Sequence, residues 1–236
     1  MHVVIVDGMT TILGAVRTVA TRALDAALPA NCLGCGAEGA PICVRCEPAL
    51  HARAQSPAGV PIGLPGELPE PLLQLEWCTS FQGIARDALH AIKYSGEQRL
   101  AEPLGRTIAR RWAAVGVGAT LVTNVPVHAD RAKQRGYDQA ELIARVAARD
   151  LRLPFIPLLR RARATIAQFD LDRRDRARNV RRAFAVKPGF EEHVRGAWVL
   201  LIDDVVTTGS TLAACATALH DAGALGVSAV TVARER

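Results

Sequence analysis

Two adjacent carboxylates near the C-terminal end of the chain have the residue types and spacing that could do chemistry. They lie in the segment VLLIDDVVTTGST, residues 199–211, where Asp203 and Asp204 follow four apolar residues. Such an apolar run predicts a strand buried on both faces, with the acids emerging at its end. Neighbouring carboxylates repel each other unless a cation or hydroxyl donors meet them. The vicinal hydroxyls of a ribose, or a sugar that carries Mg²⁺, would satisfy both acids.

The residues that follow the acids predict a phosphate site. The sequence TTGST leads into a predicted helix, and the first N–H groups of a helix have no partner within it. These amides, the hydroxyls and the positive helix end all favour a phosphate monoester, and Gly209 lets the backbone approach closely. The candidate residues are Thr207, Thr208, Gly209, Ser210 and Thr211. The whole segment therefore predicts a site for a phosphorylated ribose; the plainer interpretation is a buried strand followed by a capped helix.

Other nucleotide-binding patterns are absent from the sequence. No G-x-x-x-x-G-K-[ST] occurs, which excludes a P-loop, and no G-x-G-x-x-G follows a predicted strand. The aspartate pair of a receiver domain belongs to the first strand, whereas the pair here follows the second-to-last predicted strand.

Four of the six cysteines form two C-x2-C pairs, a spacing typical of metal-binding knuckles. The pairs are CLGC and CVRC, and together they supply Cys32, Cys35, Cys43 and Cys46. Four thiolates would fill the tetrahedral shell of Zn²⁺ and leave no position for water, so the predicted zinc is structural and not hydrolytic. A disulfide or redox pair, an iron–sulfur cluster and coincidence are the alternative interpretations.

Strands and helices must alternate along the chain to position these residues. The predicted strands cover residues 73–81, 119–127, 155–158, 198–202 and 227–233, and the predicted helices cover 84–94, 100–115, 139–150 and 210–222. This alternation favours an α/β fold whose parallel sheet is built through right-handed crossovers. Ligands bind such sheets outside the carboxyl ends of the strands, which is where the two acids fall.

The composition divides the chain into four predicted parts. They are an amphipathic helix region (1–28), the cysteine module (29–55), a linker rich in proline and glycine (56–72) and the α/β domain (73–236). No apolar run reaches the roughly 18 uncharged residues of a membrane span. The first part also lacks the basic start of a secretory signal. We therefore expect a cytoplasmic protein with no membrane span.

The positive charge of the chain is concentrated in one segment. The formal net charge is +6, and residues 160–182 alone contain nine arginines against three aspartates, the same excess of six. Such a patch attracts polyanions, including diphosphates, nucleotides and nucleic acid. The alternative is a solvated loop that happens to be rich in arginine.

Taken together, these motifs resemble the ComF/GntX family of phosphoribosyltransferase-like proteins. Residues 199–211 resemble the 5-phosphoribosyl-1-diphosphate (PRPP) signature of type I phosphoribosyltransferases, and the family places a four-cysteine zinc module before that domain. Its K-Y-x-G, R-G-F-N-Q and Q-x-x-L…R-x-x-N…A-F elements are matched by Lys93, Tyr94, Gly96, Arg135, Gly136, Tyr137, Gln139, Gln168, Leu171, Arg176, Asn179, Ala183 and Phe184. One residue departs from the pattern, since Asp138 replaces the family's asparagine and exchanges a donor for a charge.

The resemblance implies a type I phosphoribosyltransferase-like parallel sheet flanked by helices, and the binding of PRPP with Mg²⁺. It assigns Asp203 and Asp204 to the ribose hydroxyls as catalytic residues and the TTGST turn to the 5-phosphate. The residues expected to meet the diphosphate are Arg131, Lys133, Arg135 and Gly136. The implied glycosyltransferase reaction displaces diphosphate through an oxocarbenium-like state, which the protein assists by positioning and charge neutralisation. No motif identifies the acceptor or shows that the chain is catalytically active.

A second function, from another class, is also implied, because the family is associated with DNA uptake in competent bacteria. An accessory protein of that kind would use the fold without catalysis and hold single-stranded DNA with its arginines. The arginine-rich segment 160–182 falls where phosphoribosyltransferases carry a mobile loop. The residues of it expected to contact nucleic acid are Arg173, Arg174, Arg176, Arg178 and Asn179. Partners from the competence machinery or other proteins belong to the same expectation, while no pattern indicates the oligomeric state.

Overall fold

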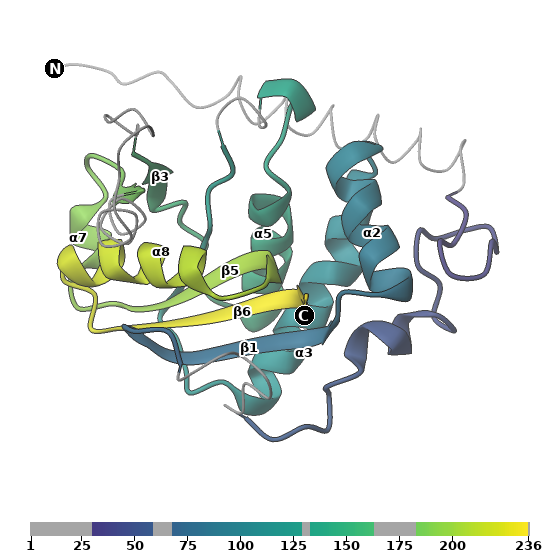
Figure 1. Cartoon of the computed structure of the whole chain (residues 1–236), viewed down its shortest axis with the longest axis horizontal. Helices are drawn as coiled ribbons and strands as arrows, with labels where there is room; N and C mark the ends of the chain where they lie inside the picture. Colours follow the sequence, from purple (N-terminus) through teal and green to yellow (C-terminus); the bar gives the residue numbers. More distant parts are fainter. Residues whose placement is uncertain (1–29, 59–67, 129–132, 163–182, 236) are drawn as a thin grey trace, which may run out of the picture.

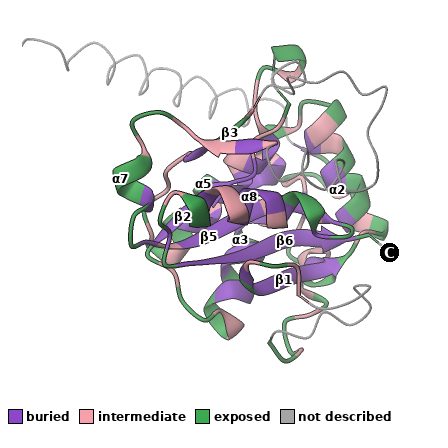
Figure 2. Ribbon diagram, turned by 60° about the vertical axis from the view of Figure 1, so that its left-hand side comes forward, coloured by how far each residue is buried: buried purple, intermediate pink, exposed green. Residues whose placement is uncertain are grey.

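Four parallel strands form the central sheet of the computed structural model, in the order β1-β6-β5-β2 (Figure 1 and Figure 2). The structure describes residues 30–58, 68–128, 133–162 and 183–235. The strands are β1 (Leu72–Ser80), β2 (Leu121–Asn124), β5 (Trp198–Val206) and β6 (Gly226–Arg234), with β3 (Leu159–Arg161) and β4 (Phe184–Val186) in a separate antiparallel pair. The helices are α2 (Gly83–Tyr94), α3 (Ala101–Val115), α5 (Gln139–Leu151), α7 (Glu191–Val194) and α8 (Ser210–Asp221), with short 3-10 helices η1 (Glu47–His51) and η2 (Gln98–Leu100). The predicted α/β fold with a parallel sheet is therefore confirmed.

Strand β5 is covered on both faces, as its uninterrupted apolar sequence predicts. Side chains alternate along a strand, so Leu200 and Ile202 enter one core while Val199 and Leu201 enter the other. Helices α2, α3 and α5 build the first core, and α8 with the β3-β4 pair builds the second. Figure 2 shows the resulting layers, with the buried strands lying between helices. None of the helices within the described ranges has the length and apolar character needed to cross a membrane.

The predicted strand over residues 155–158 is wrong. Only an isolated bridge joins Phe155 to Val122, and the next regular strand, β3, begins at Leu159. Pro154 and Pro157 have no N–H group, so this segment cannot continue a hydrogen-bonded ladder. The strand predicted over 119–127 is shortened to β2 at its two ends, and that predicted over 198–202 is extended to Val206. The predicted amphipathic helix at 1–28 lies outside the described residues.

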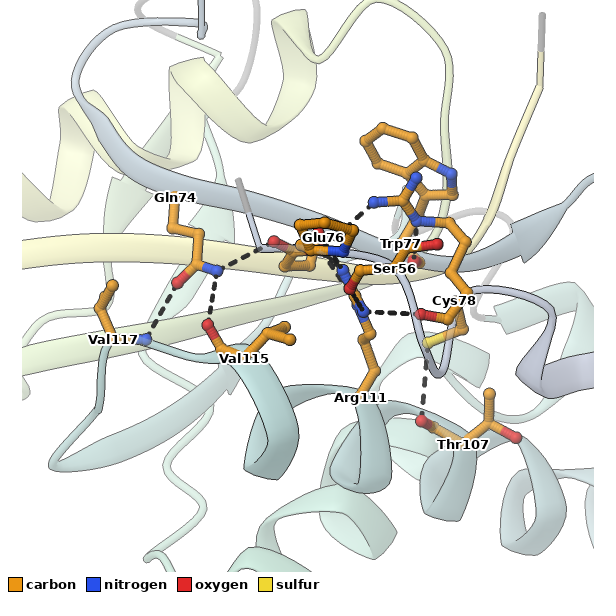
Figure 3. A network of polar contacts seen from close by, with 11 residues as sticks. Ser56, Gln74, Glu76, Trp77, Cys78, Thr107, Arg111, Val115 and Val117 are labelled. Atoms are coloured by element: carbon orange, nitrogen blue, oxygen red, sulfur yellow. Dashed lines mark hydrogen bonds and ion pairs between the residues drawn. The ribbon is translucent and has the colours of Figure 1, made fainter. Parts of the chain in front are cut away.

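A buried ion pair joins β1 to α3. Its arginine also binds the last residues of the cysteine module and the chain directly after them (Figure 3). Arg111 Nη2 lies 2.7 Å from Glu76 Oε2, and both side chains are almost fully buried. The same guanidinium donates to the carbonyl oxygens of Arg53 at 2.6 Å, Ser56 at 2.7 Å and Pro57 at 3.0 Å. Because one cation satisfies a buried carboxylate and three carbonyls, it fixes where the segment from Arg53 to Pro57 lies.

The cysteine module packs against the same end of the α/β core. Ile42 and Leu50 are buried in the cluster formed by α2 and α3. The Arg53 guanidinium lies 3.9 Å from the centre of the Trp77 ring, and Thr79 Oγ1 donates to Ala49 O at 3.2 Å. Apolar, cation–π and hydrogen-bonding contacts therefore all hold this module to β1.

We expect the variant Arg111→Met to lower the free energy of unfolding by about 3 kcal/mol or more. The change removes the closest cation from the buried carboxylate of Glu76 and the donor from three carbonyls, while it keeps a long side chain in α3. Urea denaturation followed by circular dichroism measures the difference.

The matched control is Arg106→Met in the same helix, whose ion pair with Glu102 is exposed. We expect a change within about 1 kcal/mol, as for other exposed pairs. Equal losses in the two variants would contradict the role assigned to the buried pair.

Candidate functional site

The carboxylate of Asp204 is held by a cation and an amide from two different helices. It lies near the end of β5, where Lys93 Nζ at the end of α2 is 2.9 Å from its Oδ2. Gln139 Nε2, at the start of α5, donates to the same oxygen at 3.0 Å. The sequence placed Lys93 only in the K-Y-x-G element, whereas the structure pairs it with Asp204. This pairing compensates one of the two adjacent charges.

The neighbouring carboxylate of Asp203 is compensated much less. Asp203 lines the same cavity as Asp204, but Lys93 Nζ and Gln139 Nε2 both contact the carboxylate of Asp204. Asp203 Oδ1 accepts a hydrogen bond from the backbone N–H of Asp204 at 2.8 Å. Burial and the charge of Asp204 raise the pKa of Asp203 well above its usual range, against the lowering effect of Lys93. A ligand that brings hydroxyl donors or a cation would therefore stabilise the ionised form.

The turn after β5 has the shape of an anion-binding loop. Gly209 adopts φ 80°, a left-handed conformation that glycine accepts without strain, and α8 begins at the next residue. A Cβ at this position would lie only 2.8 Å from Pro69 Cγ. Thr208 Oγ1 and Ser210 Oγ are 2.8 Å apart, which places two hydroxyls beside the start of the helix. The N–H of Ser210 lies 3.4 Å from Thr208 Oγ1, and because Gly209 has no side chain to cap α8, the amides that follow can serve a ligand.

Two adjoining pockets connect the acids with this turn. A cavity of about 300 Å³ is lined by both carboxylates together with Arg135, Arg161 and Thr211, among others. A smaller pocket of about 40 Å³ is lined by Asp203 and by the predicted phosphate-binding residues Thr207, Thr208, Gly209, Ser210 and Thr211. Asp203 and Thr211 line both pockets, so the predicted ribose and phosphate positions share a wall.

The residues predicted for the diphosphate are only partly brought together. Arg135 lines the larger cavity, where its Nη1 donates to Gln139 Oε1 at 3.0 Å. Lys133 and Gly136 are exposed and line neither pocket. Arg131 lies outside the described residues, and so do the residues predicted for the mobile loop, Arg173, Arg174, Arg176, Arg178 and Asn179.

The structure adds two cavity residues to which the sequence gave no role. Gln139 was part of a matched motif, and that motif was the only signal available for it. Arg161 reaches the cavity from β3, where its Nε donates to Pro126 O at 3.1 Å and its guanidinium lies 4.9 Å from the centre of the Phe184 ring. No pattern distinguished Arg161 from the other arginines of residues 160–182.

Asp138, which departs from the family pattern, has a structural role. Its Oδ1 accepts from the backbone N–H of Glu141 at 3.1 Å, which caps α5. Its Oδ2 accepts from the backbone N–H of Val127 at 3.1 Å and from Asn124 Nδ2 at 3.3 Å. Burial raises the pKa of Asp138, although these backbone hydrogen bonds oppose the rise. The carboxylate thus joins the end of β2 to the start of α5, beside the cavity.

The four predicted metal ligands lie together at one point of the N-terminal module. The sulfur atoms of Cys32, Cys35, Cys43 and Cys46 are all within 4.8 Å of one another, and Cys35 Sγ is 3.6 Å from Cys43 Sγ. Zn–S bonds of about 2.3 Å imply tetrahedral S–S separations of about 3.8 Å. A Cβ at Gly34 would lie 2.8 Å from Cys46 Sγ, so glycine lets the knuckle close around the sulfurs. The donor set therefore fits a tetrahedral metal ion.

The thiols of this cluster differ in acidity. Burial opposes ionisation of Cys32, but hydrogen bonds from backbone N–H groups, including that of Cys43, lower its pKa to about 6. Hydrogen bonding with Cys35 raises the pKa of Cys46 to about 12. A metal ion at the centre of the four sulfurs would favour the thiolate form at every position.

Comparison with known proteins places the chain among relatives from bacteria. No protein-family model matches it. Among solved structures, the glutamine PRPP amidotransferase from B. subtilis shares 21% identity at a TM-score of 0.42, over 61% of this chain and 30% of that one.

Two curated relatives cover more of the chain than the amidotransferase structure does, and a third covers less. The DNA utilization protein YhgH of Escherichia coli (strain K12) is 30% identical over 194 residues, which is 79% of this chain and 81% of the relative. The protein of the same name from Salmonella typhi is 30% identical over 202 residues, which is 79% of this chain and 87% of that relative. Competence protein F of Haemophilus influenzae is 37% identical over 89 residues, 37% of this chain and 38% of that protein. The chain therefore belongs to the family of DNA utilization protein YhgH and competence protein F, the ComF/GntX family.

Proposed function

We propose that the chain binds PRPP together with Mg²⁺ and transfers its phosphoribosyl group with release of diphosphate. The observation that carries this proposal is the wall shared by two pockets. Asp203 and Thr211 line both the 300 Å³ cavity and the 40 Å³ pocket of the turn. A ribose beside the carboxylates would therefore reach the turn with its 5-phosphate.

The diphosphate would lie on the side of the cavity that carries cations. Arg135 and Arg161 line this cavity, and both can present several N–H donors to phosphate oxygens. Mg²⁺ would supply further positive charge for the diphosphate and ribose oxygens while it keeps several of its waters. These groups would neutralise the charge that develops on the diphosphate as it leaves the ribose.

The acids would orient the ribose and stabilise the oxocarbenium-like state. Asp204 is held in one position by Lys93 and Gln139, which reduces the cost of ordering it when ligand binds. A ligand would stabilise the ionised form of Asp203, whose pKa is raised by burial and by the charge of Asp204. A cytoplasmic location, where PRPP would be supplied, belongs to the same proposal.

A second candidate function is the binding of single-stranded DNA as an accessory protein for DNA utilization or uptake. The relatives named for DNA utilization and for competence favour it. The excess of arginine in residues 160–182 supplies charge for a phosphate backbone. One chain could perform both functions if PRPP and DNA occupy different residues.

We also propose that the four cysteines bind one structural Zn²⁺ and that the module over residues 29–55 depends on it. The module is short, and among its described residues Ile42 and Leu50 are buried in the first core, which α2, α3 and α5 build. Such a segment gains much of its folding free energy from the metal. Residues 56–72 would then link it to the phosphoribosyltransferase-like domain at 73–236.

Isothermal titration calorimetry with PRPP and Mg²⁺ tests the first proposal. We expect the native chain to bind and Asp203→Asn to bind at least about tenfold more weakly, because it loses a charged acceptor for ribose hydroxyls or the cation. In the same variant we expect the free energy of unfolding at pH 7 to rise. The folded chain holds the Asp203 proton more tightly than the unfolded chain, so the stability of the native protein falls as pH rises between the two pKa values.

Thr217→Ser is the control, since Thr217 lies in α8 and its hydroxyl bonds only one turn back, to Ala213 O. Diphosphate release over a panel of candidate acceptors separates transfer from binding alone. If the native chain gives no heat with PRPP, or if Asp203→Asn binds it equally well, the PRPP proposal is wrong.

The DNA proposal is tested with four substitutions made together, Arg173→Glu, Arg174→Glu, Arg176→Glu and Arg178→Glu. We expect salt-sensitive binding of single-stranded DNA to be lost, with the salt slope falling by about 0.7 for each phosphate contact removed. Fluorescence anisotropy at several salt concentrations measures it. Unchanged DNA affinity in this variant would reject the arginine segment as the DNA site.

Metal analysis of the purified chain tests the zinc proposal. We expect one Zn²⁺ per chain, its loss in Cys43→Ser, and a lower thermal midpoint after removal by a chelator, since metal binding contributes to folding. Cys78→Ala is the matched control because Cys78 is a buried cysteine outside the cluster, and it should retain the metal. A chain with full stability and no metal would contradict the proposal.

A further inference from the structure

Tyr94 presents an aromatic ring to solvent at the rim of the candidate site. It is the last residue of α2, and 70% of it is exposed. The guanidinium of Arg135 lies 5.2 Å from the centre of its ring, and the ring of His90 lies 5.4 Å away on the same helix. A large exposed ring beside a guanidinium is a ready-made surface for stacking another planar group.

A second cavity opens on this ring. Its volume is about 500 Å³, and its wall includes Tyr94, Tyr137, Arg135 and Gln134. Tyr137 is fixed because its hydroxyl donates to the carbonyl oxygen of Ile92. Arg135 is oriented by its hydrogen bond to Gln139. The volume falls within the range of small-molecule sites, and two of the wall residues are held in place before any ligand binds.

This cavity adjoins the proposed phosphoribosyl cavity through shared residues. Lys93, Tyr94 and Arg135 line both. A planar ring stacked on Tyr94 would therefore lie next to a ribose held at Asp203 and Asp204. That is where an acceptor must be placed if a ring nitrogen is to attack the ribose as diphosphate leaves.

The charges of the wall indicate which kind of ring it would accept. Lys93 and Arg135 are donors only, and among the residues that the structure describes, none that lines this cavity is acidic. A ring whose edge carries oxo groups offers acceptors to these donors, and it can also bear a negative charge. An amino group that faces Lys93 or Arg135 would set donor against donor, and it would have to turn to the Gln134 oxygen or the Ser95 hydroxyl for an acceptor.

We propose that Tyr94 and Arg135 form the stacking site for an oxo-substituted nitrogen heterocycle, such as a 6-oxopurine or a dioxopyrimidine, beside the phosphoribosyl cavity. As the acceptor site of a transferase this inference rests on the proposed function, whereas the binding of the ring itself does not. Tyr94 supplies the stacking face, and Arg135 supplies both a planar cation and hydrogen-bond donors for the oxo edge.

Equilibrium dialysis of the full chain with labelled bases tests this site. The probes are hypoxanthine, xanthine, uracil and orotate, with adenine and cytosine as their amino-bearing counterparts, each in the presence and absence of Mg²⁺ and PRPP. We expect at least one of the oxo bases to bind at least about tenfold more tightly than its amino counterpart, since hydrogen bonds to charged groups are the stronger ones. Hypoxanthine against adenine is the sharpest comparison, because the two rings have the same size.

Variants assign the binding to the ring and to the guanidinium. We expect Tyr94→Ala to lower the affinity for the base about tenfold or more. Tyr94→Phe should retain most of the affinity, since both the tyrosine and the phenylalanine ring can stack. Arg135→Lys keeps the charge, loses the planar fork and should reduce the preference for the oxo base. The control is Leu225→Ala, an exposed apolar residue just before β6, which should leave base binding unchanged.

The outcomes separate this inference from the PRPP proposal. If an oxo base binds through Tyr94 while PRPP gives no heat, the stacking site stands and the transferase proposal fails. If PRPP binds but none of the four oxo bases does, or if Tyr94→Ala binds them equally well, the stacking site is wrong and the PRPP proposal stands. Equal affinities for hypoxanthine and adenine would overturn the proposed preference for oxo groups.

Discussion

Two adjacent carboxylates at the end of a strand buried on both faces are the constraint that organises this molecule. Ionised acids in such a place are costly unless donors or cations reach them. The fold compensates Asp204 with Lys93 and Gln139, which come from α2 and α5. Burial and the charge of Asp204 raise the pKa of Asp203, and the hydrogen bond from the backbone N–H of Asp204 offsets this rise only in part. The contacts of Lys93 and Gln139 therefore hold Asp204 in place, whereas Asp203 is the acid whose charge the protein compensates less.

The parallel sheet explains how residues far apart in the sequence reach these acids. Val125 and Pro126, which directly follow β2, line the cavity, and β5 supplies the acids, both at the carboxyl edge of the sheet. Asp138 joins the end of β2 to the start of α5 through two backbone N–H groups, which places Gln139 beside Asp204. The carboxylate of Asp138 therefore caps α5 and links its first turn to the chain that follows β2. Its replacement of the family asparagine is compatible with an intact site.

Periodicity and motif spacing predicted the layers of the fold, the position of the two acids and of the TTGST turn beside one another, and the cysteine cluster. Each of these is a local signal: an apolar run, a glycine in a left-handed turn, or a pair of cysteines two residues apart. The pairing of Lys93 with Asp204 and the entry of Arg161 from β3 depend on contacts between distant segments, which one sequence does not encode locally. The strand predicted at 155–158 failed because apolar composition outweighed the two prolines in that prediction.

Helix α2 connects the cysteine cluster with the candidate site. At its first turn, Ile84 lies so close to Gly34 that a Cβ there would come within 2.8 Å of Ile84 Cδ1 and of Cys46 Sγ. At its other end, the helix presents Lys93 to Asp204 and Tyr94 to the second cavity. A helix of 12 residues is a stiff rod of about 18 Å, so a contact that holds its first turn also limits where its last turn can lie. The buried Arg111 adds to this restraint, because it binds the chain that leaves the module to the same sheet. The N-terminal module and its four-cysteine cluster thus help to hold α2, and with it Lys93 and Tyr94, in place.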